Sequence, residues 1–368
     1  MRLLDRKTTV PARVDSRFRG GMAGAVEVDR AGLAKALRET VEGEVRFDTA
    51  SRALYATDAS NYRQPPIGVV VPRTLDDVVA THAACREFGA PLLNRGGGTS
   101  LSGETVNFGV VVDHSKYLRE ILEIDAQEGW AHVQTGVVNE QLNEATGEYG
   151  LIFPPDPSTH QYCTIGGNLG NNSCGVHSVQ AHLFGHGPRT SDNTHSLEVV
   201  TYDGLRMWVG ETSDEELESI VAAGGRRGEI YAALRDLRNR YADRIRERFP
   251  SVDELPRRVS GYNLDELLPE KGFNVARALV GTESTCASIL TAKMLLTRNT
   301  AWRTLVVIGF EDICVAADHV PQIIEHRPIG LEGIDHQLFE NEMELKLHPS
   351  ELSEMPEGYA WLMVEFGG

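Results

Sequence analysis

Three consecutive glycines constrain this sequence more than any other feature. Residues 95–103 read Arg-Gly-Gly-Gly-Thr-Ser-Leu-Ser-Gly and follow a short apolar run at residues 91–93. Because glycine has no Cβ, the backbone there can adopt positive φ and lie against a ligand, and successive N–H groups can surround phosphate oxygens. The hydroxyl groups and the charge of Arg95 add donors for the same anion. The stretch predicts a strand followed by a pyrophosphate-binding loop, with a flexible surface turn as the alternative.

Two common phosphate-binding loops match this stretch only in part. The dinucleotide fingerprint G-x-G-x-x-G fails because Leu101 stands where its third glycine belongs. The P-loop pattern comes closer, since Gly98, Gly103 and Thr105 have its spacing, but Glu104 replaces the lysine. A carboxylate at that position repels phosphate, so nucleotide hydrolysis is not expected. A phosphate-binding protein with this near-miss P-loop remains one alternative.

Charge and cysteine content exclude several classes of protein. The 368 residues suffice for two or three domains, and the net charge of −17, dispersed along the chain, argues against non-specific binding to nucleic acid or an anionic membrane. The five cysteines include no C-x-x-C pair, which favours reduced thiols in a cytoplasmic protein. No apolar run reaches the ~18 residues of a membrane span, and no secretory signal is expected.

Two further glycine-rich stretches follow the first. Residues 164–175 combine glycine, asparagine and small hydroxyl residues without a hydrophobic period, shortly after the rigid segment 154–158. Such a stretch can place amide groups against a flat polar ligand; an irregular surface loop is the alternative. Residues 185–193 precede an expected strand at 196–202, which Asp203-Gly204 turns into a second strand at 206–209.

The periodicity of the whole chain predicts an α+β order, with strand–helix–strand followed by strand pairs. Residues 1 to about 28 are expected to be an arm without regular structure. Further strands are expected at 67–71, 90–94, 109–113, 121–125, 130–135, 288–296, 304–310, 329–334 and 359–366, and helices at 31–41, 74–88, 138–149, 214–223, 229–249, 274–280 and 314–324.

In this order the motifs resemble the FAD-binding domain of the vanillyl-alcohol-oxidase and p-cresol-methylhydroxylase (PCMH) superfamily. The resemblance runs from about Pro65 to Thr297 and is carried by residues 166–168, 171–175 and 189–193 as well as by the first loop. Within the superfamily the chain looks most like the FAD-linked 2-hydroxyacid dehydrogenases, in particular bacterial fusions with an iron–sulfur half. The resemblance implies an arm and short helix in residues 1–48, a PCMH-type domain of two α/β subdomains in 49–298, and an incomplete α+β cap domain in 299–368.

The resemblance also implies a cofactor and the residues that hold it. The first loop would hold the pyrophosphate, the second and third stretches the flavin and ribityl groups, residues 198–200 the adenine end, and Glu283 a late turn against FAD. The implied residues are Arg95, Gly96, Gly97, Gly98, Thr99, Ser100, Leu101, Ser102, Gly103, Pro155, Asp156, Pro157, Ser158, Thr164, Ile165, Gly166, Gly167, Asn168, Asn171, Gly175, Asp192, Asn193, Glu198, Val200 and Glu283.

Two departures from the family pattern have consequences. Members with covalent flavin have a histidine where Thr99 stands, so FAD is expected to be non-covalent. The late turn usually has glycine after the glutamate, but this chain has Ser284. If that position requires positive φ, the serine costs about 1 kcal/mol of backbone strain.

The function that the resemblance implies is oxidation of a small D-2-hydroxyacid, of the D-lactate, glycolate or D-2-hydroxyglutarate type, with hydride transfer to flavin N5. An iron–sulfur or quinone acceptor is a possible partner. The catalytic and substrate-binding residues are not identified and are expected beyond residue 368. A flavin-binding module without turnover is a second alternative.

Several residues remain without a functional role at this point. His177, His182 and His186 are close in sequence but lie in a glycine-rich segment, and no metal site is expected from them. Cys174 is expected to pack structurally. Residues 257–263 are interpreted equally as a loop near the ligand or as a solvated turn.

Overall fold

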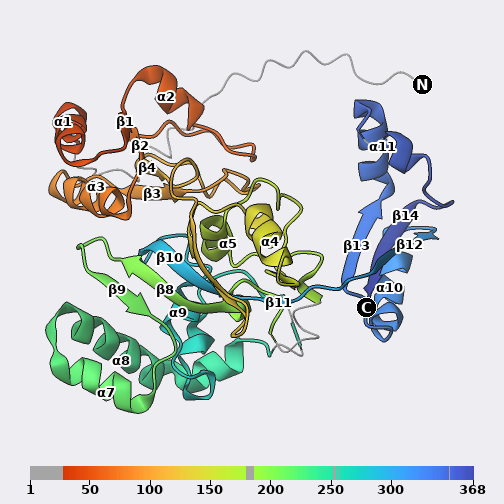
Figure 1. Ribbon diagram of the computed structural model, residues 1–368. Helices are drawn as coiled ribbons and strands as arrows, with labels where there is room; N and C mark the ends of the chain where they lie inside the picture. Colours follow the sequence, from red (N-terminus) through yellow and green to blue (C-terminus); the bar gives the residue numbers. More distant parts are fainter. Residues whose placement is uncertain (1–27, 180–185, 252–253, 256, 348) are drawn as a thin grey trace.

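The computed structural model describes residues 28–179, 186–251, 254–255, 257–347 and 349–368. The expected N-terminal arm, residues 1 to about 28, therefore lies almost entirely outside the described residues. His182 also lies outside them. Three layers follow one another along the chain, and Figure 1 shows them as a mixture of sheets and helices. The α+β prediction is confirmed.

The first layer is a four-stranded sheet with the order β1-β2-β4-β3, in which β2, β4 and β3 run parallel and β1 is antiparallel at the edge. Its strands are β1 (Glu44–Arg46), β2 (Gly68–Val71), β3 (Leu92–Arg95) and β4 (Val110–Asp113), and its helices are α1 (Arg30–Thr40), α2 (Thr49–Leu54) and α3 (Leu75–Glu87). Strands β2 and β4 are buried along their whole length, which explains their unbroken valine runs.

Hydrogen bonds at the N-terminus of α3 connect this helix to the turn before β1. Thr74 accepts a hydrogen bond from the Asp77 amide, and the Asp77 carboxylate in turn accepts from the amide of Thr74. This capping box satisfies donors that the first helical turn leaves free. Asp77 also accepts from the amides of Glu42 and Gly43 in the turn before β1, so one buried carboxylate fixes both a helix start and a strand entry.

The second layer is a five-stranded antiparallel sheet with the order β5-β6-β10-β8-β9. It contains β5 (Ile121–Asp125), β6 (Trp130–Gln134), β8 (Thr194–Val200), β9 (Arg206–Val209) and β10 (Ser288–Leu295), with β10 at its centre although it is the last in sequence. The helices around it are α4 (Asn139–Gly147), α5 (Ile165–Asn171), α7 (Asp214–Ala223), α8 (Gly225–Arg248) and α9 (Val275–Leu279). Short 3-10 turns lie at Ser191–Asn193, Leu264–Leu267 and Pro269–Lys271.

Apolar contacts join the first two layers. Val78 of α3 and Val112 of β4 are fully buried in one cluster with Val200 of β8 and Leu290 of β10. The hydroxyl of Tyr202 donates to the carbonyl of Ala90 at 3.0 Å across the same boundary. The two sheets therefore hold the loops between them in fixed relative positions.

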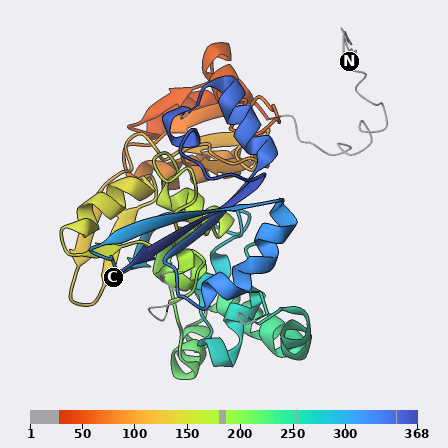
Figure 2. The same ribbon diagram turned by 90° about the vertical axis from the view of Figure 1, so that its right-hand side faces the viewer.

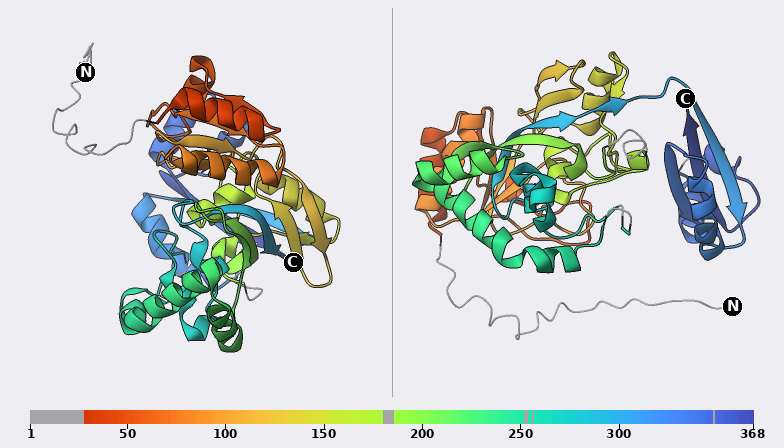
Figure 3. Two further views of the ribbon diagram at one scale, coloured as in Figure 1. Left: turned by 90° about the vertical axis from the view of Figure 1, so that its left-hand side faces the viewer. Right: turned by 90° about the horizontal axis from the view of Figure 1, so that it is seen from below.

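The third layer is a three-stranded antiparallel sheet with the order β12-β14-β13. It consists of β12 (Arg303–Phe310), α10 (Ile313–Ile324), β13 (Gly330–Asp335), α11 (His336–Leu345), α12 (Pro349–Leu352) and β14 (Ala360–Gly367). The short strand β11 (Thr297–Arg298), which pairs with β7 (Leu151–Ile152), leads into it. Figure 1 and the right-hand view of Figure 3 show this layer beside the other two, and in Figure 2 it lies in front of them.

The structure corrects one interpretation and adds elements that the periodicity did not predict. The second glycine-rich stretch begins with helix α5, although it shows no hydrophobic period. Strand β1 and helices α2, α11 and α12 were not expected. Strand β1 and helix α2 are short, and helix α11 is largely exposed, so no apolar period marks these three elements. Among the described residues, no helix combines the length and apolar character needed to cross a bilayer.

Candidate cofactor-binding site

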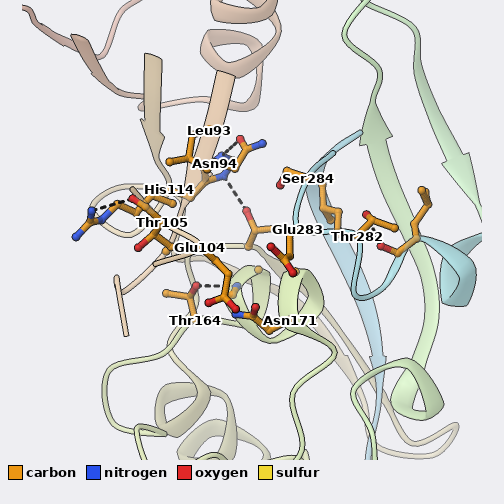
Figure 4. Close-up of a pocket in the computed structure, with 18 residues that line it drawn as sticks. Leu93, Asn94, Glu104, Thr105, His114, Thr164, Asn171, Thr282, Glu283 and Ser284 are labelled. Carbon is orange, nitrogen blue, oxygen red and sulfur yellow. Dashed lines mark hydrogen bonds between the residues drawn. The ribbon is translucent and has the colours of Figure 1, made fainter. Parts of the chain in front are cut away.

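Two adjoining cavities lie between the first loop, the second glycine-rich stretch and the late turn, whereas the described residues of the third stretch, 186–193, line neither cavity. The first, of about 70 Å³, is lined by Leu93, Asn94, Arg95, Gly96, Glu104, Thr105, His114, Thr135, Thr164, Gly166, Gly167, Gly170, Asn171, Leu279, Thr282, Glu283, Ser284 and Ile289. The second, of about 140 Å³, is lined by Gly96, Gly97, Gly98, Thr99, Ser100, Thr105, Pro157, Thr159, Cys163, Thr164, Gly167, Asn168, Asn171 and Ser173. Figure 4 shows Asn94, His114 and Thr105 on one side of the first cavity and Thr282, Glu283 and Ser284 on the other.

The first loop needs glycine because it lies against the second stretch. A Cβ on Gly96 would stand 2.1 Å from Thr164 Oγ1, and a Cβ on Gly97 would stand 2.2 Å from the carbonyl oxygen of Tyr162. Gly98 and Gly103 adopt positive φ, of 67° and 82°. The triple glycine thus allows two backbone segments to approach closely and leaves main-chain groups at the cavity surface.

Arg95 makes structural contacts that the sequence did not suggest. Its guanidinium donates to the carbonyls of Thr57 and Thr105, at 3.0 and 3.2 Å, and lies over the ring of Tyr55. These contacts hold the two ends of the loop together. Arg95 lines the first cavity, but its donors to these carbonyls are already in use, so the loop's main-chain N–H groups are better placed to bind an anion.

Two carboxylates border the first cavity. Glu104 accepts a hydrogen bond from Ser100 Oγ, and Glu283 lies across the cavity from it. Burial raises the pKa of the Glu104 carboxyl, and the neighbouring charge of Glu283 adds to the rise. The P-loop alternative is not supported, because strand β4 and not a helix follows this loop.

Helix α5 is built to pack closely at its first turn. Thr164 caps it by accepting from the amide of Gly167 at 3.2 Å, and a Cβ on Gly166 would stand 2.8 Å from Thr135 Cβ. Asn168 is almost fully buried and lines the second cavity, yet its side-chain Nδ2 has no hydrogen-bond partner. A buried amide without a partner is costly, so this group is a ready donor to a ligand.

A chain of buried polar side chains lies behind the first cavity. His114 contacts Thr135 Oγ1 through Nδ1 and Asn94 Oδ1 through Nε2, both at 2.9 Å. The amide of Asn94 donates to Ser288 Oγ, which also contacts His82 Nε2 at 2.8 Å. Burial lowers the pKa of His114 to about 4, and burial together with Arg86 lowers the pKa of His82 to about 4, so both rings are neutral at pH 7. Sequence reasoning missed this chain; its one signal is the histidine directly after the buried strand β4.

The late turn has the strain that the sequence suggested. Glu283 and Ser284 both adopt positive φ, of 52° and 63°. The turn is held on α5, since the amides of Gly281 and Glu283 donate to the carbonyls of Leu169 and Gly170 at 2.8 and 3.1 Å. Several hydrogen bonds therefore maintain a conformation that two L-residues rarely adopt.

The predicted cofactor residues fall into two groups. Those that line one of the two cavities are Arg95, Gly96, Gly97, Gly98, Thr99, Ser100, Pro157, Thr164, Gly166, Gly167, Asn168, Asn171 and Glu283. Those that line neither are Leu101, Ser102, Gly103, Pro155, Asp156, Ser158, Ile165, Gly175, Asp192, Asn193, Glu198 and Val200.

Three residues of the second group, Asp192, Glu198 and Val200, make structural contacts elsewhere. Asp192 is paired with the buried Arg189, with 2.7 Å between Oδ1 and Nη2. Glu198 of β8 forms an ion pair with Arg206 of β9, with 2.7 Å between Oε1 and Nε. Val200 belongs to the core between the first two layers. These side chains are thus occupied by structural contacts.

Residues 257–263 pack against the second glycine-rich stretch and the late turn. Arg257 donates to the carbonyl of Gly175 at 3.1 Å, and its Nε lies 3.3 Å from Cys174 Sγ. The hydroxyl of Tyr262 lies 2.6 Å from Thr285 Oγ1. The segment thus lies beside two parts of the site, but its residues line neither cavity, so both interpretations stay open. In the described part of the chain, no group of three or more His, Cys, Asp or Glu residues is arranged to hold a metal ion.

Comparison with known proteins gives one family match and several relatives. Residues 66–210 match the model of a family described as FAD binding domain. The chain is 33% identical over 309 residues to the D-2-hydroxyglutarate dehydrogenase of Pseudomonas putida, which is 83% of this chain and 30% of the relative. It is 29% identical over 301 residues to the glycolate oxidase subunit GlcD of Bacillus subtilis, which is 80% of this chain and 52% of that subunit. The chain thus spans about a third to a half of the length of these relatives.

Two solved structures share the fold at low sequence identity. An alkyldihydroxyacetonephosphate synthase superposes with a TM-score of 0.59 and 15% identity, over 91% of this chain and 56% of that one. A p-cresol methylhydroxylase with substrate bound gives 0.57 and 13%, over 91% and 60%. These similarities concern the fold alone.

Proposed function

We propose that the chain is the FAD-binding part of an enzyme that oxidises a small D-2-hydroxyacid, because residues 66–210 match the FAD binding domain family. The relatives that carry this proposal act, by their names, on D-2-hydroxyglutarate and glycolate. When bound, the flavin would supply the hydride acceptor for the substrate carbon. We further propose residues 49–298 as the FAD-binding domain and 299–368 as part of a cap domain.

The residues present fit FAD, and this fit is the observation that carries the proposal. Two adjoining cavities are bordered by main chain that only glycine permits at Gly96 and Gly97, and by the unpartnered amide of Asn168. The first loop would bind the pyrophosphate through its N–H groups, and Asn168 would donate to a polar atom of the cofactor. Thr99, at the edge of the second cavity, offers no nitrogen nucleophile, which supports non-covalent binding.

Two further parts of the proposal concern the cellular compartment and the electron acceptor. Cys85, Cys163, Cys174, Cys286 and Cys314 are all free thiols, which supports a reducing compartment such as the cytoplasm. Electrons from the flavin would pass to an iron–sulfur or quinone acceptor supplied from outside these 368 residues.

The test is an absorption spectrum of the purified chain followed by anaerobic addition of substrate. Flavin bands near about 370 and 450 nm that pass into the supernatant after acid precipitation would establish non-covalent FAD. Bleaching on addition of D-2-hydroxyglutarate, D-lactate or glycolate would establish a dehydrogenase. Flavin that no hydroxyacid bleaches would favour a binding module without turnover, and a chain that does not take up added FAD would contradict the proposal.

A further inference from the structure

One imidazole connects the cofactor-binding layers to the C-terminal layer. His177 Nδ1 lies 2.5 Å from Asp156 Oδ2, and His177 Nε2 lies 2.6 Å from Glu365 Oε2. The backbone amide of His177 also donates to Asp156 Oδ1 at 2.9 Å. The three side chains are only 13–18% exposed, so water screens their charges weakly. Asp156 and His177 come from the segments around the second cavity, and Glu365 comes from β14.

Each partner of His177 is held on rigid backbone. Asp156 lies in the proline-rich segment, and Gly175 packs against it so closely that a Cβ there would stand 2.0 Å from the Asp156 carbonyl oxygen. Glu365 lies on β14, the central strand of its sheet. It pairs in register with Gly330 of β13, where a Cβ would stand 3.3 Å from His177 Cδ2. Glycine at position 330 thus lets the ring approach the sheet.

Arg303 completes the cluster from the neighbouring strand β12. Its Nη1 lies 3.3 Å from Glu365 Oε1 and 3.3 Å from His177 Nε2, and its Nη2 donates to Asn299 Oδ1 at 2.6 Å. Asn299 belongs to the connection between β11 and β12, and its amide donates to the carbonyl of Gly150. The cluster therefore lies beside the connection that leads from β11 into the C-terminal layer.

The two short contacts favour a charged imidazole. Both ring nitrogens lie 2.5 and 2.6 Å from carboxylate oxygens, which only accept hydrogen bonds, so a ring that carries both protons satisfies both contacts. Arg303 Nη1, which only donates, lies farther from Nε2, at 3.3 Å, and opposes the charge. Burial would lower the pKa of His177, but hydrogen bonds and charges from Asp156 and Glu365 together raise it. A neutral ring would leave one carboxylate facing a lone pair. The charged groups that contact the ring are Asp156, Glu365 and Arg303.

We propose that His177 is a positioning residue that holds the C-terminal layer against the cofactor-binding layers through its charged form, and that this contact opens as His177 loses its proton. The contact joins the C-terminal layer to Asp156, the neighbour of Pro157 at the second cavity, so it sets the position of that layer relative to the cofactor site of the proposed function, on which this inference rests. The closed arrangement is fully favoured below the ordinary pKa of histidine and is lost as pH rises through the raised pKa. The contact involves only residues of this chain and no substrate, so the pH dependence is expected whichever substrate the enzyme oxidises.

The test compares the full 368-residue chain with the variant Glu365→Gln, which keeps the shape of the side chain and removes its charge. The control is Glu140→Gln, because His160 Nδ1 and Glu140 Oε2 form a similar 2.5 Å pair that is more exposed and lies within one layer. Small-angle scattering and the rate of limited proteolysis between β11 and β12 report the closed fraction without any need for FAD or substrate.

At pH 6 the natural chain should be compact, and it should become more extended, with faster cleavage, by pH 9. Glu365→Gln should be cleaved about tenfold faster at pH 6, as expected for loss of a hydrogen bond between charged groups, while Glu140→Gln should match the natural chain. Equal scattering and cleavage of the natural chain at the two pH values would overturn the proposal, and that comparison does not depend on the folding of a variant. Equal behaviour of Glu365→Gln and the natural chain at pH 6 would also overturn it.

Discussion

The side-chain amide of Asn94 donates to Ser288 Oγ at 2.5 Å, although 194 positions separate the two residues. Asn94 lies on β3 of the first sheet, and Ser288 begins β10 of the second. The bond therefore joins the two layers directly behind the first cavity. Since the Oδ1 of Asn94 accepts from His114, the same amide also fixes which nitrogen of that imidazole carries the proton.

The variant His114→Leu should lose stability without loss of packing volume. It leaves Asn94 Oδ1 and the buried Thr135 Oγ1 without the ring that bonds both. We expect the free energy of unfolding to fall by about 2–4 kcal/mol, measured by urea denaturation at pH 7. His132→Leu is the control, because His132 hydrogen-bonds to Thr291, packs edge-on against Trp208 and is half-buried; it should cost about 1 kcal/mol. Equal losses in the two variants would contradict the role given to this chain.

The neutral histidines behind the cavity should make the chain sensitive to acid. The pKa of His82 falls to about 4 in the folded state, mainly through burial, so the unfolded chain binds this proton first as pH falls. Stability from His82 is therefore complete above pH 6.5 and is lost between pH 6.5 and 4, by roughly 3 kcal/mol in total. Denaturation series at pH 7, 6 and 5 should show this decline, and His82→Gln should show a shallower one. Parallel curves for the two proteins would exclude His82 as a source.

Gly96 should be required for cofactor binding, whereas a glycine elsewhere should not. A Cβ at Gly96 would meet Thr164 Oγ1 at 2.1 Å and push the first loop away from α5. Gly96→Ala should weaken FAD binding at least about tenfold, since a misplaced loop loses several N–H contacts to the pyrophosphate. Gly147→Ala in α4 is the control, because nothing lies within 4 Å of a Cβ there. Titration of the apo chains with FAD, followed by flavin fluorescence, measures both; equal affinities would refute the placement of the pyrophosphate.

Sequence patterns predicted much of this fold because its strands and longer helices bury long apolar faces. The valine runs of β2 and β4 and the capping residues of α3 are visible directly. Helix α5 was missed because three of its seven residues are glycines, which leaves too few apolar side chains for a helical period; Gly166 is the one that a close approach to Thr135 requires. The contact of His177 with Glu365 was not predictable either, since 188 positions separate them and only the placement of the third layer brings them together.

Replacing serine by glycine should have opposite effects on stability in the late turn and in helix α7. Ser284 has a φ of 63°, which glycine adopts without strain, so Ser284→Gly should stabilise the chain by about 1 kcal/mol. The control Ser219→Gly lies in the exposed middle of α7, where glycine lowers helix stability by about 0.5 kcal/mol. Thermal unfolding of both variants should therefore shift the midpoint in opposite directions. A lower midpoint for Ser284→Gly would mean that the serine hydroxyl makes a contact that outweighs the strain. Because the turn borders the first cavity, the same variant should bind FAD at least as tightly as the natural chain.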